Sequence, residues 1–205
     1  MAISMGAYRI GFGRNYSEGL LYQLNSDGQS YTVAGIGVCI ASTIVVPATY
    51  NGLPVTSIGD SAFEACENIK KIVLRNGILA IGTRAFYGCK ALESITIPES
   101  VTSIGASAFY NCFGLQSLVI PSSITSIGES AFYSCKALES VSIPGSVAVI
   151  EEGTFAECEN IVDIVIENGV TSIGANAFYN CKSLDNVTIP ESVTNISNDA
   201  FKTGA

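Results

Sequence analysis

Residues 92–112 read LESITIPESVTSIGASAFYNC, and residues 115–135 repeat the pattern as LQSLVIPSSITSIGESAFYSC, 23 residues further on. Phenylalanine keeps this interval at Phe63, Phe86, Phe109, Phe132, Phe155, Phe178 and Phe201. Cysteine keeps it at Cys66, Cys89, Cys112, Cys135, Cys158 and Cys181. Because the residue types stay in phase without an insertion, each unit must meet its neighbours in the same geometry. The repeat therefore predicts a one-dimensional stack of coils.

The first half of each unit has the pattern of a strand followed by a turn. Leu92, Ile95 and Ile97 have the L-x-x-I-x-I spacing of a leucine-rich repeat strand, whose alternation sends Ile95 and Ile97 inward and Ser94 and Thr96 outward. Proline ends this strand in four coils, because it fixes φ and lacks an N–H. Two coils have Asn-Gly at the same place, which is also a turn signal.

The second half of each unit predicts a short extended piece, a reversal and a helical turn. Val101 and Ile104 point inward, and Gly105 is expected to allow a tight reversal. A short helical or 3₁₀ turn then carries Ala108, Phe109 and Cys112 on one face. Each coil supplies about seven inward apolar groups that it cannot bury alone, so the core must lie between coils.

The sequence before the repeats predicts a cap. Leu20, Tyr22 and Leu24 alternate with polar residues, turn residues follow, and Tyr31 and Val33 alternate again, which predicts a β-hairpin. We expect residues 1–19 to be disordered or expression-derived, residues 20–38 to form the cap, and residues 39–205 to form about seven coils. The extra residues 48–52, ATYNG, are expected to bulge out as a loop.

Composition excludes several classes of function. The 205 residues include 18 acidic and 10 basic side chains, a formal charge of -8, and no histidine. Non-specific nucleic-acid binding depends on Lys and Arg, so nucleic acid is not expected as a partner. The missing imidazole removes the commonest general base and most catalytic zinc sites. No apolar run approaches the roughly 18 to 20 residues of a membrane span, and the first residues indicate no signal peptide.

The cysteine ladder predicts buried free thiols. In-register coils lie about 4.8 Å apart, and parallel Cβ atoms at that distance exceed the roughly 3.5–4.5 Å that a disulfide prefers. A line of thiols without histidine is also unsuited to a metal site. Cys39 is out of phase, and we give it the same interpretation. The acidic residues around 151–167 match no calcium loop and are interpreted as a solvated face.

Two surfaces are candidates for binding. A tyrosine follows the repeat phenylalanine in four coils, which predicts an aromatic stripe that either contacts a protein or sugar or shields the turns. The outward strand positions form a flat face of small residues that either docks a large partner or is plain scaffold. The stripe consists of Tyr87, Tyr110, Tyr133 and Tyr179. The strand-face candidates are Ser94, Thr96, Ser117, Val119, Ser140 and Ser142.

The pattern IP-x-SVTSIG-x-xAF-x-xC-x-xL resembles the BspA-like branch of the leucine-rich repeat family from about Leu20 onward. The resemblance implies a right-handed solenoid with a parallel sheet, in proteins of bacterial or protist cell surfaces that bind other proteins or host matrix. It implies no catalytic residues. The pattern weakens where Glu151 replaces glycine and Thr154 replaces alanine, and again where Gly204 replaces cysteine.

Together these patterns predict a β-rich α/β solenoid that works as a non-enzymatic recognition module. The resemblance implies an extracellular or cell-surface location and a protein ligand or host matrix component as the partner, with no cofactor. A structural spacer within a larger surface protein and a glycan-binding module are the alternatives. No nucleophile–base pair or oxyanion donor set is visible, which is why an enzyme is not expected.

Overall fold

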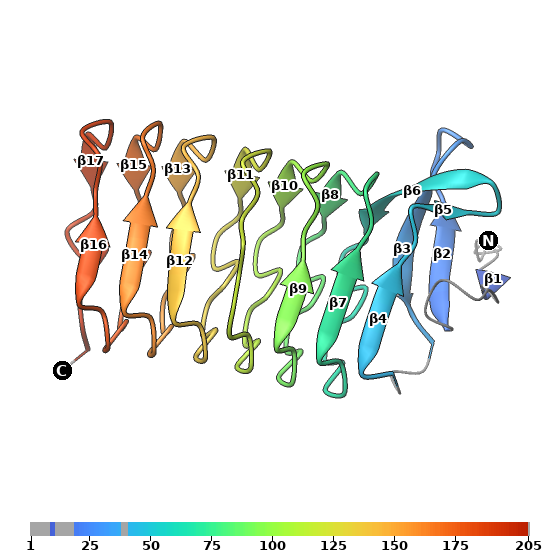
Figure 1. Ribbon diagram of the computed structural model, residues 1–205, viewed down its shortest axis with the longest axis horizontal. Coiled ribbons are helices and arrows are strands. Elements are labelled where there is room, and N and C mark those ends of the chain that lie inside the picture. Colours follow the sequence, from blue (N-terminus) through green and yellow to red (C-terminus); the bar gives the residue numbers. More distant parts are fainter. Residues whose placement is uncertain (1–8, 11–18, 38–40, 205) are drawn as a thin grey trace, which may run out of the picture.

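The computed structural model describes residues 9–10, 19–37 and 41–204, which form a parallel β-solenoid of about seven coils (Figure 1). We number the coils by their repeat phenylalanine, from coil 1 with Phe63 to coil 7 with Phe201. Coils 2 to 7 begin at residues 69, 92, 115, 138, 161 and 184. Residues 1–8 and Cys39, on which two of the expectations fall, lie outside the described residues, as do 11–18.

Every coil contributes a back strand to the stack, and every coil except coil 4 contributes a front strand. The front strands are β4 (Thr43–Val46), β7 (Lys71–Leu74), β9 (Ser94–Thr96), β12 (Ser140–Ile143), β14 (Asp163–Ile166) and β16 (Asn186–Thr188). The back strands are β6 (Leu53–Ile58), β8 (Ala80–Ile81), β10 (Ser103–Ile104), β11 (Ser126–Ile127), β13 (Val149–Ile150), β15 (Ser172–Ile173) and β17 (Asn195–Ile196). Within coils 2–7, paired strands are in register with a shift of one repeat, as in Ile72 beside Ile95.

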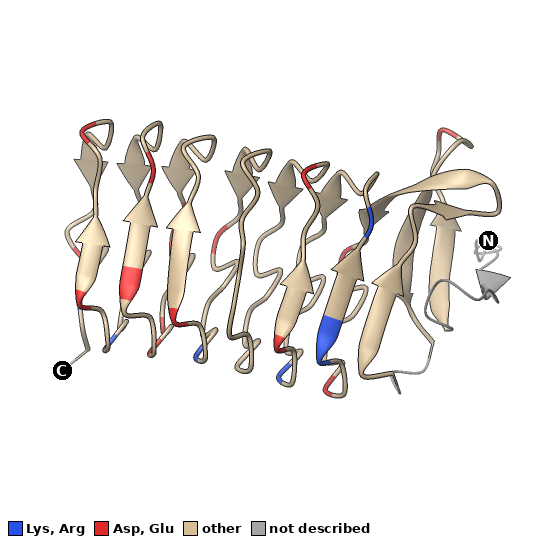
Figure 2. Cartoon of the chain, in the orientation of Figure 1, with Lys and Arg blue, Asp and Glu red and all other residues tan. Residues whose placement is uncertain are grey.

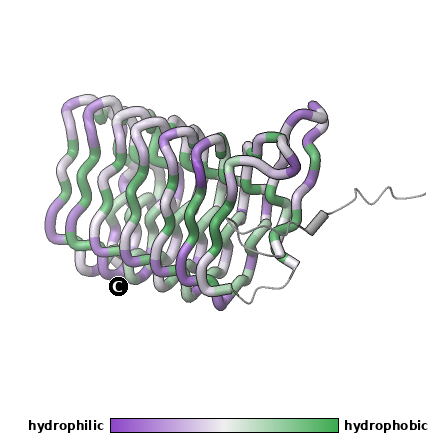
Figure 3. Tube along the Cα trace, turned by 45° about the vertical axis from the view of Figure 1, so that its right-hand side comes forward, coloured by the Kyte–Doolittle hydropathy of each residue, from purple (hydrophilic) through white to green (hydrophobic). Residues whose placement is uncertain are grey.

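The core lies between the coils, as the repeat predicts. Phe86, Phe109 and Phe132 are fully buried and stack with ring centroids 5.1 Å apart. The inward isoleucine, leucine, valine, alanine and cysteine residues form parallel rows beside them, visible as apolar bands along the stack in Figure 3. Because every coil repeats the same inward set, one continuous core runs the length of the array.

The segment that carries the repeat phenylalanine is not helical, so the expectation of a helical or 3₁₀ turn is wrong. Amides there alternate between two kinds of partner. Ala108, Tyr110 and Cys112 donate to the carbonyl three residues back, whereas the amides between them donate to the next coil. Those donors are Ser107, Phe109 and Asn111, with N–O distances of 2.7–2.9 Å. Ser107 and Asn111 have φ of 54° and 60°, values that interrupt a helix. A helix would need these amides for its own hydrogen bonds, but here they donate to carbonyl groups of the next coil.

The repeated glycine also has a different role from the expected one. Gly105 is outside the left-handed region, and a Cβ on it would lie 2.5 Å from Thr83 N and 2.6 Å from the carbonyl carbon of Gly82. Gly82 and Gly128 are equally close to the preceding coil. Glycine is therefore required because two backbones approach closely, not because the chain reverses there.

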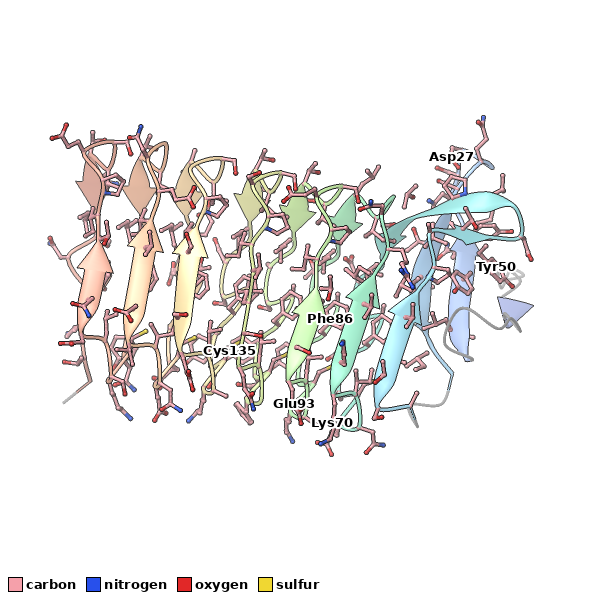
Figure 4. All side chains as sticks on the ribbon, viewed as in Figure 1. Asp27, Tyr50, Lys70, Phe86, Glu93 and Cys135 are labelled. Atoms are coloured by element: carbon pink, nitrogen blue, oxygen red, sulfur yellow. The ribbon has the colours of Figure 1, made fainter. Side chains whose placement is uncertain are left out.

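The N-terminal end is covered by an antiparallel hairpin. β2 (Leu20–Leu24) pairs with β3 (Tyr31–Ile36), and β3 pairs in parallel with β6 of coil 1, while β1 (Arg9–Ile10) pairs with the outer edge of β2. The expected loop at residues 48–52 is instead part of a second hairpin, in which β5 (Thr49–Tyr50) pairs with β6. Tyr50 folds inward and stacks on Tyr22 with a centroid distance of 3.9 Å (Figure 4). This aromatic contact explains why the insertion is ordered against the cap.

Candidate functional site

Repeated hydroxyl groups at the turns are structural. Ser100 donates to the carbonyl of Ile78 at 2.7 Å, and Ser123, Ser146 and Ser192 make the equivalent bond in their coils. At the position two residues after this serine, Thr102, Thr125, Thr171 and Thr194 also donate to a carbonyl of the preceding coil, at 3.0–3.5 Å. These hydroxyls satisfy backbone carbonyl groups and are not available as a recognition surface.

The outward positions of the front strands, which we call the front face, are different. The hydroxyls of Ser94, Thr96, Ser117 and Ser140 have no hydrogen-bond partner within the described residues. Ser142 donates to Glu167 at 3.1 Å. The structure thus brings the six candidates into adjacent rows on coils 3 to 5, with most of their hydroxyl groups free to bond a partner.

Exposed apolar side chains interrupt this polar face. Val119 is 77% exposed, more than any other large apolar side chain among those described, and Val165 and Val162 are 43% and 39% exposed. Val119 and Val165 belong to one outward row, with Ser142 between them. Figure 2 shows that the front strands carry few charges. The face therefore combines apolar contact with free hydroxyl groups.

A shallow hollow of about 480 Å³ opens beside the front face on coils 5 and 6. It is lined by Glu139, Ser140, Asn160, Val162, Asp163 and Ser183. Only Ser140 of these was a candidate from the sequence. The signal that could have found the hollow is Val162, which occupies the register position of Glu139 and so leaves an apolar gap in an otherwise polar row.

The tyrosine stripe is only partly assembled. Tyr87, Tyr110 and Tyr133 stack in parallel at 5.0 and 4.5 Å between centroids, and the Arg84 guanidinium lies 4.3 Å from the Tyr87 centroid. Tyr179 is separated from them by the coil that has Ala156. Burial, followed by the neighbouring Tyr110, raises the pKa of Tyr133. The rings cover one another's faces, so mainly their edges and hydroxyl groups remain for a ligand.

Exposed ion pairs tie neighbouring coils together at the edges of the array. Lys70 bonds Glu93 at 3.0 Å across one repeat (Figure 4). Lys136 bonds Glu159 at 2.7 Å, also across one repeat. Exposed pairs of this kind contribute little stability. Their effect is to neutralise charges that would otherwise repel along the stack.

The described part of the chain shows no group of three or more side chains suited to a metal ion. It likewise contains no helix with the length and apolar character of a membrane span. The front face and the tyrosine stripe are the two candidate binding surfaces.

The model of the BspA type leucine rich repeat region matches residues 79–204 with six copies. The chain belongs to this family. Its repeats are typical of protein–protein interaction modules on bacterial surfaces, and solenoids of this kind are typically non-enzymatic. No curated protein matches the chain.

Solved structures share the fold. A leucine-rich repeat protein of Treponema pallidum is 29% identical with a TM-score of 0.83, over 87% of this chain and 83% of that one. A leucine rich cell surface protein of Faecalibacterium prausnitzii is 28% identical with a TM-score of 0.77, over 94% and 52%. A leucine-rich repeat protein of Bacteroides ovatus is 25% identical with a TM-score of 0.67, over 95% and 57%. The chain spans little more than half the length of the last two.

The cysteine ladder is suited to packing rather than chemistry. Six cysteines are buried as free thiols, and Cys112 Sγ lies 3.2 Å from the carbonyl oxygen of Phe86, to which it donates. Burial raises the pKa of Cys112 to about 12 and the pKa of Cys135 well above its ordinary value. Because the thiolate is the reactive form, these thiols are inert at neutral pH.

We expect a Cys39→Ser variant, treated with a maleimide at pH 7.5, to gain no label while folded and six labels in denaturant. Burial and the raised pKa both slow the reaction of the ladder thiols. The measurement is intact mass after timed quenching, with the denatured sample as the control for reagent activity. Rapid labelling of Cys112 or Cys135 in the folded protein would contradict the packed ladder.

Proposed function

We propose that this chain is a non-enzymatic recognition module of a cell-surface protein and that it binds a host matrix protein through the front face. The observation that carries the proposal is Val119, a valine that is 77% exposed among hydroxyl groups without partners. The cell-surface relative in Faecalibacterium prausnitzii supports the location.

The chemistry of the front face suits a protein partner. Exposed valines bury apolar area on contact, and serine and threonine hydroxyls can both donate and accept bonds from a partner's backbone. The hollow beside the face adds Glu139 and Asp163, which would receive a basic side chain. A flat face several coils wide fits the extended surfaces that repeat proteins use.

The tyrosine stripe supports a second candidate, which is glycan binding. Three parallel rings with exposed edges and hydroxyl groups provide the mixed apolar and polar contact that sugars require. The third candidate is a structural spacer within a larger surface protein, in which neither the front face nor the tyrosine stripe binds a ligand. Variants on each surface distinguish the three.

We expect Val119→Lys combined with Ser140→Lys to weaken binding to a matrix protein at least tenfold, because it places two long charged side chains in the contact. Both residues are exposed, so the melting temperature should stay within a few degrees. The probes are purified fibronectin, laminin and collagen on biosensor tips, and a glycan array. The matched control is Tyr110→Ser combined with Tyr133→Ser, which should bind normally.

The remaining outcomes decide against the proposal. Loss of binding only in the tyrosine variant would move recognition to the stripe, and glycan-array signals that depend on those tyrosines would establish the sugar-binding alternative. Absence of binding to every matrix protein and glycan would favour the spacer.

A further inference from the structure

Backbone hydrogen bonds are missing on the strand side of the junction between coils 4 and 5. In other coils, the amide after the repeat isoleucine donates to the preceding coil, as Gly105 does to Ile81 at 2.8 Å and Gly174 to Ile150 at 2.8 Å. At the junction of coils 4 and 5, the equivalent amide of Glu151 makes no such bond within the described residues. The amides of Ala148 and Glu139 lack theirs as well, although Thr171 and Val162 one coil later have them.

The strand pairing stops at the same junction. The back sheet ends at β11, and β13 begins a new one; on the front, β12 begins a separate sheet of three strands (Figure 1). The coil 4 segment at residues 118–120 is not a strand and is joined to β9 only through the bridge between Ser94 and Ser117. The back ladder is therefore interrupted between coils 4 and 5, and the front ladder is interrupted from coil 3 to coil 5 apart from that bridge.

The opposite side of this junction is intact. Ser130, Phe132 and Ser134 donate to coil 5 at 2.8–2.9 Å, as their equivalents do elsewhere. The rings of Phe132 and Phe155 stack at 5.2 Å, close to the 5.1 Å of the preceding pairs. Ser146 Oγ also keeps its bond to the Ile124 carbonyl at 2.6 Å. The two parts of the array are thus joined along the phenylalanine side and largely unjoined between the strands.

Glu151 supplies the physical cause. It occupies the position where coils 2, 3, 4 and 6 have glycine, and a Cβ on those glycines would come within 3.0 Å of backbone atoms in the preceding coil. Ser197 of coil 7 has a side chain at the same position and still donates its amide to the Ile173 carbonyl at 3.0 Å, so a Cβ alone does not prevent the bond. The longer, charged side chain of Glu151 is therefore the feature that distinguishes the junction of coils 4 and 5, where the amides around it lack their hydrogen bonds.

Core exposure is raised beside the break. Leu118 and Ile120 are each 7% exposed, whereas the equivalent Ile164 and Ile166 are each 1% exposed. The difference is small, and among coils 2 to 6 it is found on coils 3 and 4, where Ile95 and Ile97 show 8% and 9%. Within the interior of the array, the edge of the core is therefore most exposed to water on these two coils.

We infer that the array consists of two rigid blocks, coils 1–4 and coils 5–7, that pivot about the phenylalanine side of this junction. The pivot opens and closes the gap between Val119 on coil 4 and Ser140 on coil 5. The front face that we propose for recognition would then adapt its curvature to a partner. The pivot itself does not depend on that function and is tested on the free protein.

Hydrogen exchange in the free wild-type protein gives the first test. We expect the amides of Glu139, Ala148 and Glu151 to exchange at least tenfold faster than those of Val162, Thr171 and Gly174, because only the second set is hydrogen-bonded. Equal protection of the two sets would overturn the inference.

Two substitutions at one position test the cause. Glu151→Gly removes the Cβ and should slow exchange at Ala148 and residue 151 at least tenfold, because the coils can close. Glu151→Ala removes the carboxylate but keeps the Cβ, so it should also slow exchange, because Ser197 keeps its inter-coil bond with a Cβ in place. Slow exchange in Glu151→Gly alone would show that the Cβ holds the coils apart, and fast exchange in both variants would show that glutamate is not the cause. Either result would overturn this account.

Spin labels measure the motion of the two blocks directly, so this test does not depend on how far the Glu151→Gly variant closes the junction. In a Cys39→Ser background the buried thiols are inert, so cysteines placed at residues 119 and 142 would carry the labels. We expect a broader distance distribution for this pair than for a pair at residues 142 and 165, which lies within one block. Equal widths would show a rigid junction and contradict the pivot.

Discussion

Phe109→Ala should lower the free energy of unfolding by about 3–5 kcal/mol, among the largest effects that one side chain in this protein can have. Phe109 is fully buried and stacks on Phe86 and Phe132 at 5.1 Å on both faces. Its removal loses the transfer free energy of the ring and leaves a cavity that a regularly spaced stack closes poorly. Urea unfolding monitored by circular dichroism measures the change.

Phe201→Ala is the matched control for this prediction. Phe201 belongs to the same ladder but lies on coil 7, where it is half-buried and stacks on Phe178 alone at 5.0 Å. Its removal should cost less than half as much as the loss of Phe109. A cost below 1 kcal/mol for Phe109→Ala, or equal costs for the two variants, would refute the stacked core.

Gly105→Ala should destabilise the protein by about 2–3 kcal/mol although it adds only a methyl group. That group would lie 2.5 Å from Thr83 N, and backbone atoms held in two ladders cannot move aside cheaply. We expect the damage to resemble the natural break at Glu151, with faster exchange of the amides that join coils 2 and 3 on the strand side.

Gly35→Ala controls for the general effect of replacing glycine in a strand. Gly35 lies in β3, outside the left-handed region, and an added Cβ would meet its nearest neighbour, the Ala62 carbonyl oxygen, at an ordinary 3.6 Å. This variant should change the free energy of unfolding by less than about 0.5 kcal/mol. If Gly105→Ala is equally mild, close approach is not the reason for the repeated glycine.

The candidate site was predicted in part. The outward positions of the front face follow from strand alternation, so Ser117, Val119 and Ser140 could be named from their register alone. What alternation does not reveal is which hydroxyls already have a partner. Thr102 and Thr96 both lie on strand-like segments, yet only Thr102 donates to the preceding coil. That distinction depends on where a neighbouring carbonyl lies in space.

The amino-acid sequence alone determined the period, the number of coils and the inward residues. A strict repeat of 23 residues forces equivalent neighbours, and an apolar set that one coil cannot bury forces stacking. These conclusions need no coordinates, because they depend only on spacing and on the burial of apolar groups. The rows of phenylalanine and cysteine in the core confirm them.

Only the tertiary structure decided how the backbone amides are used. The segment around Phe109 has a helix-like spacing, but its amides alternate between a local turn and the next coil. Glycine at residue 105 and glutamate at residue 151 differ because the backbone of Gly105 closely approaches the preceding coil and bonds it, whereas the amide of Glu151 makes no bond to that coil within the described residues. Local spacing cannot distinguish these cases, since the competing hydrogen-bond partners and the steric limit both come from a neighbour about 23 residues away in the chain.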